Sequence, residues 1–323
     1  MVNMVHDLLV ERGLSVISKT TGEEAILRVA GESFRINRPR SVLEENLQVI
    51  KIPHDIAIIE NQAITPYTMK VFHRIVKPSI VIITNVRMDH TEFLGEDRRE
   101  IAKSFVSSLN EYVEVVISGE TREELEEIIK TGLHKFGTEY IRAGGCGIPG
   151  SEAVGIAEEV VRLVTGERIR DEEKLRLIST IEEMFSVKRS GELLWYNGAK
   201  VNDPDSAEIL LDYLSKKYRR GIVISANFRS DRRDRTSLFA DFLRKWSEKD
   251  TIRSIFVSGY AAKSVSNYIG RKCISLKEDL SSARRLIEFA VREGAILTLL
   301  ANRKTKFVDL ILGEIERLSP LDR

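Results

Sequence analysis

Short apolar runs rich in β-branched residues alternate along the chain with longer stretches whose apolar residues return every three or four positions. The first pattern is typical of β-strands and the second of amphipathic helices. Several runs are apolar at consecutive positions, as parallel strands covered by helices on both faces require. We expect strands at 55–59, 79–86, 113–118, 139–142, 192–196, 221–227, 253–258 and 295–300. We expect helices between them, including 97–109, 152–164, 207–218, 237–246 and 281–292.

Strands that alternate with helices predict an α/β fold with mostly parallel sheets. The helix-rich stretch 172–185 ends in the polar segment SVKRSG, after which a new series of strands and helices begins. We place a boundary there, between domains 1–188 and 189–323. The 323 residues are enough for two domains, each with its own core. The first recognisable element is a helix at 2–11, so the first sheet starts with no strand ahead of its first helix.

The composition excludes several classes of protein. The 50 Lys and Arg residues balance 49 Asp and Glu residues, so no chain-wide field attracts nucleic acid or an acidic membrane. The hydrophobic content of 42% excludes a wholly disordered chain. No apolar run reaches the roughly 18 residues of a membrane helix, and the first residues do not resemble a signal peptide. Cys146 and Cys273 lie far apart without metal-binding spacing, which favours a soluble protein of the reducing cytoplasm.

Polar clusters follow four of the predicted strands, where open parallel sheets bind their ligands. Glu60 follows the strand at 55–59, and His90 follows the strand at 79–86. A carboxylate and an imidazole from neighbouring strands could hold a divalent cation, and Mg²⁺ with substrate phosphates takes only one or two protein ligands. The clusters after the other two strands contain Asn202, Asp203, Arg229, Asp231 and Arg232. Their arginines could clamp a polyphosphate.

Each cluster also fits a structural role. Glu60 could be a solvated residue at a helix start, and His90 could form a capping pair with Asp89 at a turn. The stretch 202–205 fits equally well a turn and helix cap with proline at the first helical position. The run 230–235 is typical of a surface covered by salt bridges. The residues by themselves leave both interpretations open.

Residues 145–150 match the pattern G-x-G-x-x-G between a strand and a helix. A dinucleotide-binding fingerprint also needs a second parallel strand with an acidic residue about 20 positions later. Residues 168–184 instead continue as a charged helix, and Pro149 removes one N–H group that would face a pyrophosphate. We interpret the motif as a glycine-rich turn.

The stretch TNVRMDH at 84–90, followed by Gly95 and the helix EDRREIAKSFVSSL, resembles the Mur ligase superfamily. Within it, the sequence is most similar to the ligase subunit of poly-γ-glutamate synthases of the PgsB/CapB type. Three further stretches support the resemblance in the family's order: KTTG at 19–22, NGAKVNDPDS at 197–206 and NFRSDRRDRT at 227–236. The resemblance covers nearly the whole chain.

The resemblance implies a Mur-ligase-like central domain of the P-loop type and a smaller Rossmann-like carboxy-terminal domain closing over ATP. It implies an ATP-dependent amide ligase in capsule biosynthesis, which forms an acyl phosphate from which the amine of glutamate or a glutamyl chain displaces phosphate. A membrane subunit of a polyglutamate synthase complex would be a partner. By position, the implied magnesium ligands are Glu60 and His90, which with Arg229 form the catalytic set. The implied contacts to nucleotide or acyl phosphate are Asn202, Asp203, Asp231 and Arg232.

The sequence departs from this family at the phosphate loop. The family has a G-x-x-x-x-G-K-[ST] pattern immediately before the first helix, and this sequence contains no such pattern. Lys19 and Thr20 lie after that helix without the preceding glycines, so they cannot replace the loop. The glycine-rich turn that the family tends to have after the last strand is also missing at 300–304. We expect this chain to lack the first strand and the phosphate loop of its family.

Two functions follow from these observations. In the first, the chain is an acid–amino acid ligase whose recorded sequence starts too late, which the coding DNA upstream of Met1 would test. In the second, it is a non-catalytic homologue serving as a structural or regulatory subunit, because each lost hydrogen bond to phosphate costs about 1.5–3 kcal/mol. Nucleic-acid binding through 230–235 is disfavoured, since the arginines alternate with aspartates and lack interleaved aromatic residues. The sequence leaves open a homo-oligomer and attachment to the inner face of the membrane through a partner.

Overall fold

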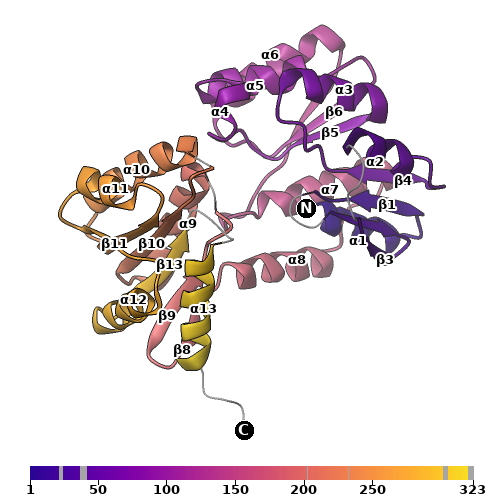
Figure 1. Cartoon of the computed structure of the whole chain (residues 1–323). Coiled ribbons are helices and arrows are strands. Elements are labelled where there is room, and N and C mark those ends of the chain that lie inside the picture. The colour runs from indigo at the N-terminus through magenta and orange to yellow at the C-terminus, as the bar shows by residue number, and fades with distance from the viewer. Residues whose placement is uncertain (22–24, 37–41, 202, 232, 301–304, 319–323) are drawn as a thin grey trace. The chain divides into compact units, whose positions relative to one another are not determined.

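The computed structural model describes residues 1–21, 25–36, 42–201, 203–231, 233–300 and 305–318. The chain divides into two units, Met1–Ile181 and Glu182–Arg323. Both units combine parallel strands with helices, so the predicted α/β class is confirmed (Figure 1). The boundary expected after residue 188 lies within strand β8 (Lys188–Ser190), whereas the division lies between residues 181 and 182.

The first unit contains two sheets. In the first sheet, β1 (Val16–Lys19) pairs in parallel with β4 (Ile56–Ile59), and the antiparallel strands β2 (Ile26–Val29) and β3 (Glu32–Arg35) extend it to the order β3-β2-β1-β4. The second sheet holds the parallel strands β5 (Ile80–Ile83), β6 (Val115–Ser118) and β7 (Glu139–Arg142). The helices are α1 (Val2–Val10), α2 (Val42–Val49), α3 (Pro66–Val76), α4 (Thr91–Leu94), α5 (Arg98–Ser107), α6 (Glu123–Leu133) and α7 (Glu152–Thr165), with a 3₁₀ turn at His134–Phe136. Helix α8 (Asp171–Met184) contains the boundary between the two units.

Strands β4 and β5 are the terminal strands of these two sheets, and both are apolar but only partly buried. Ile56 and Ile58 of β4 pack against the same core cluster as Ile80 and Ile82 of β5, and this cluster also contains Leu9 of α1. An apolar parallel strand is normally buried by neighbours on both edges and by helices on both faces. A sheet that lacks one strand between β4 and β5 would have this appearance.

Helix α1 carries a buried histidine whose polar atoms have no partner within the described ranges. The His6 side chain is fully buried, and neither of its ring nitrogens makes a hydrogen bond there. Burial and the nearby Arg28 hold the pKa of His6 below its ordinary value, while Asp7 acts in the opposite direction. The unfolded state therefore binds more protons than the folded state, so stability is fully present above about pH 6.5 and is lost as the pH falls through that value.

We predict that His6→Leu stabilises the first unit by about 1 kcal/mol at pH 7. Leucine has a volume similar to that of histidine but has no buried nitrogens that lack hydrogen bonds. The gain is expected to be larger at pH 5. At that pH the wild-type histidine takes up a proton on unfolding, which lowers the stability of the wild type but not that of the variant. Hydrogen exchange of the α1 amides at both pH values measures the effect. A variant with the same stability as the wild type at both pH values would contradict this interpretation.

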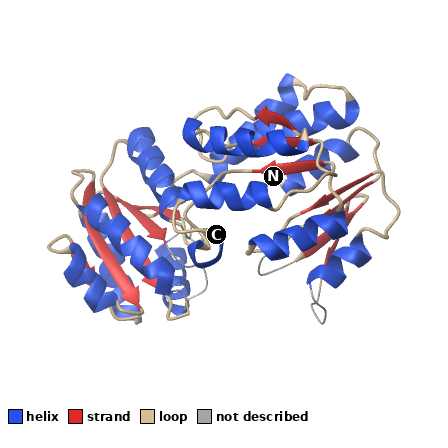
Figure 2. Cartoon of the chain, turned by 90° about the horizontal axis from the view of Figure 1, so that it is seen from above, coloured by secondary structure: helices blue, strands red, loops and turns tan. Residues whose placement is uncertain are grey.

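The second unit contains one sheet in the order β12-β11-β10-β13-β9-β8, parallel except for the edge strand β8. Its other strands are β9 (Leu193–Asn197), β10 (Ile222–Phe228), β11 (Ile252–Gly259), β12 (Cys273–Ser275) and β13 (Ile296–Leu300). Its helices are α9 (Pro204–Tyr218), α10 (Arg233–Ser247), α11 (Ala262–Ile269), α12 (Leu280–Arg292) and α13 (Lys306–Leu318). Figure 2 shows the strands flanked by helices.

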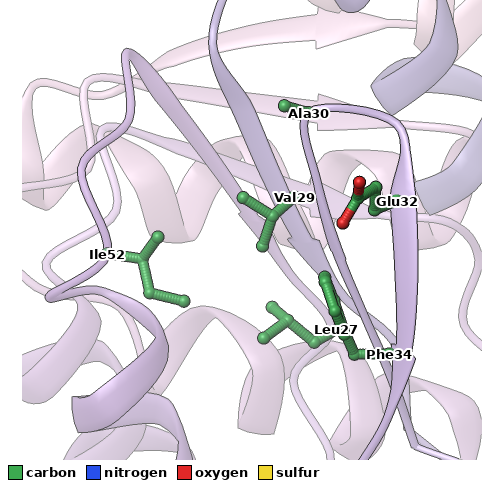
Figure 3. Close-up of a pocket in the computed structure, with 6 residues that line it drawn as sticks. All are labelled: Leu27, Val29, Ala30, Glu32, Phe34 and Ile52. Carbon is green, nitrogen blue, oxygen red and sulfur yellow. The ribbon is translucent and has the colours of Figure 1, made fainter.

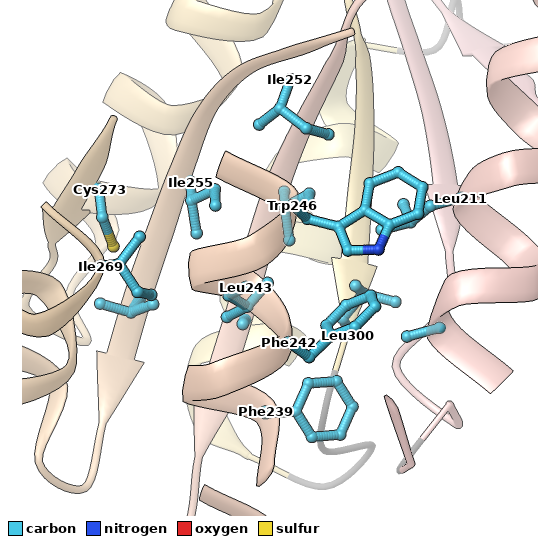
Figure 4. Close-up of a cluster of buried hydrophobic side chains, with 14 of the residues drawn as sticks. Leu211, Phe239, Phe242, Leu243, Trp246, Ile252, Ile255, Ile269, Cys273 and Leu300 are labelled. Carbon is cyan, nitrogen blue, oxygen red and sulfur yellow. The ribbon is translucent and has the colours of Figure 1, made fainter. Parts of the chain in front are cut away.

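Both faces of the sheet in the second unit are covered by apolar side chains. On one face, Phe239, Leu243 and Trp246 of α10 lie beside Ile252 and Leu300 of the sheet (Figure 4). The opposite face packs against α12 and α13 through residues such as Leu286 and Phe307. Every residue of β10 and β13 is consequently buried, which explains why most of their residues are apolar.

The order of strands in the second unit defines where a ligand would bind. From β10 the chain proceeds through β11 to β12 and then returns to place β13 on the other side of β10. Doubly wound sheets bind ligands beyond the carboxyl ends of the strands at such a reversal. The carboxyl ends of β10 and β13 are therefore the expected binding region of this unit. No helix within the described ranges is long and apolar enough to cross a bilayer.

Candidate functional site

Glu60 follows β4 and is fixed by the end of the neighbouring strand β1. Its backbone N–H donates to the Lys19 carbonyl at 3.0 Å, continuing the parallel register. Its carboxylate Oε2 accepts a hydrogen bond of 2.6 Å from the Thr21 backbone N–H. The side chain is exposed, and Thr65 rather than Glu60 caps α3, so Glu60 is not a helix-start residue. The structure thus presents an anchored carboxylate to solvent at the carboxyl end of β4.

The first turn of α1 lies close to this carboxylate. Burial lowers the pKa of the Met1 amine, and the charge of Glu60 partly offsets that effect. The N–H groups at the start of a helix have no partner within the helix and attract anions. Glu60 and the first turn of α1 therefore combine a negative side chain with a region of positive potential, as a site for a cation bound to phosphate requires.

His90 begins α4 in the left-handed backbone conformation, with φ 54°. Its N–H donates to Oδ1 of Asp89 at 3.0 Å, and its Nε2 lies 3.7 Å from Asp89 Oδ2. The His90 side chain does not cap α4 by a hydrogen bond. The imidazole is about one-third exposed and therefore accessible to a ligand.

The loop that carries His90 is held by Glu120, which our sequence analysis missed. Glu120 follows β6 and is 2% exposed. Its carboxylate accepts hydrogen bonds from the Val86 N–H at 2.8 Å and from Arg122 Nε at 2.8 Å. Arg122 also donates to the Val86 carbonyl. Glu120 lies two residues after the end of the predicted strand at 113–118, and this position was the signal that could have identified it.

We predict that Glu120→Gln loosens this loop and lowers the stability of the first unit by about 2 kcal/mol at pH 7, since hydrogen bonds to a charged group are lost. Burial alone would raise the pKa of Glu120, but hydrogen bonds from Arg122 and backbone N–H groups outweigh it and hold the pKa below its ordinary value. The stabilisation is therefore present above about pH 4.5 and is lost as the pH falls through the lower pKa of the folded state.

Thermal unfolding between pH 3 and pH 7 measures this change. The Glu120→Gln variant should lose part of the acid sensitivity of the wild type. Glu127→Gln, at an exposed position on α6, is the matched control and should change stability by less than about 1 kcal/mol. Equal effects of the two substitutions would refute the role of Glu120.

Among the described interactions, Glu60 contacts Thr21 and His90 contacts Asp89. None of them is a hydrogen bond or an ion pair between Glu60 and His90. Both residues follow strands of the same unit that α3 connects. The described residues contain no cluster of three or more His, Cys, Asp or Glu side chains that could hold a metal. Mg²⁺ with phosphates needs only one or two protein ligands, so the exposed carboxylate fits, while imidazole is a less usual ligand.

In the second unit, Asp203 is the N-cap of α9. Its Oδ1 accepts from the Ser206 N–H at 2.8 Å and its Oδ2 from the Ser206 hydroxyl at 2.5 Å. Pro204 occupies the first helical position, which confirms the predicted helix cap. Two other predicted nucleotide contacts, Asn202 and Arg232, lie outside the described residues.

Arg229 and Asp231 form a two-pronged ion pair after β10. Arg229 Nε lies 2.9 Å from Asp231 Oδ1, and Nη2 lies 2.7 Å from Oδ2. The two side chains are 40% and 56% exposed, so the pair contributes little to stability. Such a guanidinium can exchange its carboxylate partner for a phosphate at small energetic cost.

A buried amide joins two strands and the segment before α12, next to this arginine in the sequence. Asn227 at the end of β10 is 1% exposed, and its Nδ2 donates to Ser258 Oγ and to Glu278 Oε1, each at 2.7 Å. Ser258 belongs to β11, and Glu278 lies between β12 and α12. These contacts fix the carboxyl end of β10, from which Arg229 projects. The role of Glu278 could not be predicted because it lies 51 residues from Asn227.

Two other features share no residue with the clusters described above. A shallow apolar pocket lies on the β2–β3 hairpin, between Leu27, Val29, Phe34 and Ile52 (Figure 3). The glycine-rich motif at 145–150 forms a turn between β7 and α7, where Ser151 Oγ accepts from the Cys146 N–H. The turn interpretation of that motif is confirmed.

Residues 183–316 match the family model of the poly-gamma-glutamate synthase CapB C-terminal domain. The match covers most of the second unit. This match contains β10, its arginine and the Asn227 contacts, so the CapB resemblance noted in the sequence is confirmed. A comparison with curated protein sequences finds no match.

Solved structures of low sequence identity share the fold of the chain. FolC of E. coli in complex with DHPP and ADP is 14% identical, with a TM-score of 0.65 over 98% of this chain and 86% of that protein. The MurF ligase of Thermotoga maritima in complex with ADP is 12% identical, with a TM-score of 0.65 over 98% and 77%. The folylpolyglutamate synthase of Mycobacterium tuberculosis with ADP and AMPPCP is 12% identical, with a TM-score of 0.62 over 98% and 87%.

These likenesses confirm the predicted fold, a Mur-ligase-like α/β unit followed by a second α/β unit that is similar to the CapB C-terminal domain. The site residues were carried over from sequence motifs alone. The structure anchors Glu60, His90 and Asp203 in defined local environments, and it pairs Arg229 with Asp231.

Proposed function

We propose that the protein is an ATP-dependent amide ligase that joins a carboxylate to glutamate or to a glutamyl chain. The observation that carries this proposal is the match of residues 183–316 to the CapB C-terminal domain. Solved proteins with the same fold include folylpolyglutamate synthases and MurF ligases in complex with ADP, which supports ATP as the nucleotide. We propose Mg²⁺ as the accompanying metal because Glu60 offers an exposed, anchored carboxylate.

Glu60 and His90 would hold Mg²⁺, which when bound neutralises charge on the phosphates. The Thr21 N–H orients the Glu60 carboxylate, so little reorganisation is required when the nucleotide binds. The first turn of α1 would contribute N–H groups to phosphate oxygens. Asn202, Asp203, Arg229, Asp231 and Arg232 are the proposed contacts of the second unit to nucleotide or acyl phosphate.

The reaction would proceed in two balanced steps. The carboxylate oxygen attacks the γ-phosphorus of ATP, which releases ADP and forms an acyl phosphate. The amine nitrogen of the acceptor then attacks the acyl carbon, the C–O bond to phosphate breaks, and the amine loses a proton. The protein must align these groups, exclude water from the acyl phosphate and stabilise the phosphate charge.

The proposal is tested by incubating the chain with ATP, Mg²⁺, glutamate and γ-glutamylglutamate. The expected products are ADP and phosphate in equal amounts and a peptide heavier by one glutamyl residue. Turnover is expected to be slow, because the sequence contains no G-x-x-x-x-G-K-[ST] loop. Hydroxylamine should trap the acyl phosphate as a hydroxamate.

The same experiment separates the ligase from the alternative of a structural or regulatory subunit. A chain that binds Mg²⁺–ADP in calorimetry but forms neither amide nor hydroxamate would favour the subunit. ADP release that does not depend on a carboxylate substrate would contradict ligation and indicate simple ATP hydrolysis.

A further inference from the structure

Lys19 is a charged residue buried completely inside the first unit. It is the last residue of β1, and its side chain has no exposed surface. Its Nζ lies 2.5 Å from Asn46 Oδ1 and 3.2 Å from Glu45 Oε2. Both partners belong to α2 and are themselves buried, with 7% of Glu45 and none of Asn46 exposed. A buried ammonium is tolerated only when it is paired in this way.

The backbone around this lysine leads directly to Glu60. The Lys19 carbonyl accepts from the Glu60 N–H at 3.0 Å, and two residues later the Thr21 N–H donates to the Glu60 carboxylate at 2.6 Å. The Thr20 N–H between them donates to the Ile26 carbonyl at 2.9 Å. The direction of the Glu60 carboxylate therefore depends on the conformation of the three residues that begin at Lys19.

Helix α2 closes this arrangement on its other side. It packs against α3, the helix that follows Glu60 along the chain. Strand β1 pairs with β4, which ends immediately before Glu60. The side chain of Lys19 connects α2 to β1 and so completes a closed frame of β1, α2, α3 and β4 around Glu60.

We propose that Lys19 is a positioning residue, whose buried contacts with α2 hold Thr21 where its N–H orients the Glu60 carboxylate toward a Mg²⁺–nucleotide. The proposal rests on the proposed function for the identity of the ligand. Residues that orient a metal ligand typically change metal affinity by about 10- to 100-fold when they are replaced.

The test needs a variant that removes the contacts without leaving a buried unpaired charge. Lys19→Met alone strands the Glu45 carboxylate and would destabilise the fold. The triple variant Lys19→Met, Glu45→Met and Asn46→Leu replaces all three polar groups by apolar side chains of similar size. Replacement of a whole buried ion pair in this way is often neutral or stabilising. Glu45→Gln is the second variant, since it retains the shape, and its amide oxygen and Asn46 Oδ1 can still accept hydrogen bonds from the Lys19 ammonium. Lys103→Met is an exposed control.

Two measurements decide the question. The first is the exchange rate of the Thr21 amide proton by nuclear magnetic resonance, and the second is the affinity for Mn²⁺–ADP by electron paramagnetic resonance. In the triple variant we expect Thr21 exchange to become at least about tenfold faster and Mn²⁺–ADP affinity to fall about tenfold or more. Glu45→Gln should produce smaller changes of the same sign, and Lys103→Met should produce none.

If the Thr21 amide proton exchanges at the wild-type rate in the variants, the proposal is wrong, whether or not the metal affinity falls. The proposal requires Lys19 to act on Glu60 through Thr21. Unchanged Mn²⁺–ADP affinity in a folded triple variant would also overturn the proposal. If the triple variant does not fold, the same two measurements on Glu45→Gln decide the question. Failure of the proposed function has a different signature, since the wild-type chain itself would then bind no Mn²⁺–ADP.

Discussion

Glu60→Gln is expected to weaken binding of Mg²⁺–ADP by about 10- to 100-fold while leaving the fold unchanged. The amide oxygen of glutamine can still accept the hydrogen bond from the Thr21 N–H, so the local structure is retained. The substitution removes the negative charge that a hard cation prefers, and an interaction with a charged group contributes about 1.5–3 kcal/mol. Each 1.4 kcal/mol corresponds to a factor of ten in affinity.

Isothermal titration calorimetry with ADP, at fixed and saturating Mg²⁺, measures this loss. Glu139→Gln, at an exposed carboxylate that begins β7, is the matched control and should bind as the wild type does. The difference should diminish when Mg²⁺ is omitted, because the lost interaction is with the metal. If Glu60→Gln binds Mg²⁺–ADP as tightly as the control variant, Glu60 is not the metal ligand.

Most of the parallel strands were predictable because their sequences carry strong apolar signals, but the short parallel strands β1 and β12 were missed. The run at 221–227 is mostly apolar, and the structure buries every residue of the corresponding strand β10. The hairpin of β2 and β3 was missed. Every residue of β3 is exposed, so its sequence lacks the alternation that marks a half-buried strand. Ala30 and Gly31 at its turn have positive φ angles, and the glycine was the remaining signal in the sequence.

Positions after strands were predictable, but their partners were not. Glu60 could be located because it follows an apolar run, and parallel sheets bind ligands beyond the carboxyl ends of their strands. The residues that hold the site in place come from distant parts of the chain. Lys19 and Asn46 are separated by 27 positions, and Val86 and Glu120 by 34. A single sequence contains no local pattern that pairs such residues, and a lysine at a strand end gives no sign that it is buried.

We predict that Gly259→Ala lowers the stability of the second unit by about 2–5 kcal/mol. Gly259 ends β11 with φ +82°, a conformation that costs an L-residue about 1–2 kcal/mol. A Cβ atom there would lie 2.1 Å from the Phe228 carbonyl oxygen, and relief of such an overlap costs about 1–3 kcal/mol. This carbonyl also accepts the hydrogen bond from the Tyr260 N–H at 2.9 Å, so the backbone on both sides must move.

Gly294→Ala separates the two contributions. Gly294 lies in the same unit with φ +56°, but its nearest neighbour would be the Arg220 Nη1 atom at 4.0 Å, so only the backbone cost of about 1–2 kcal/mol applies. Both tryptophans of the chain, Trp195 and Trp246, belong to the second unit, so denaturant unfolding followed by their fluorescence reports on this unit. Because Phe228 directly precedes Arg229, Gly259→Ala should also impair ligation, whereas Gly294→Ala should not. Equal destabilisation by the two substitutions would mean that the carboxyl ends of β10 and β11 are not packed as closely as the structure has them.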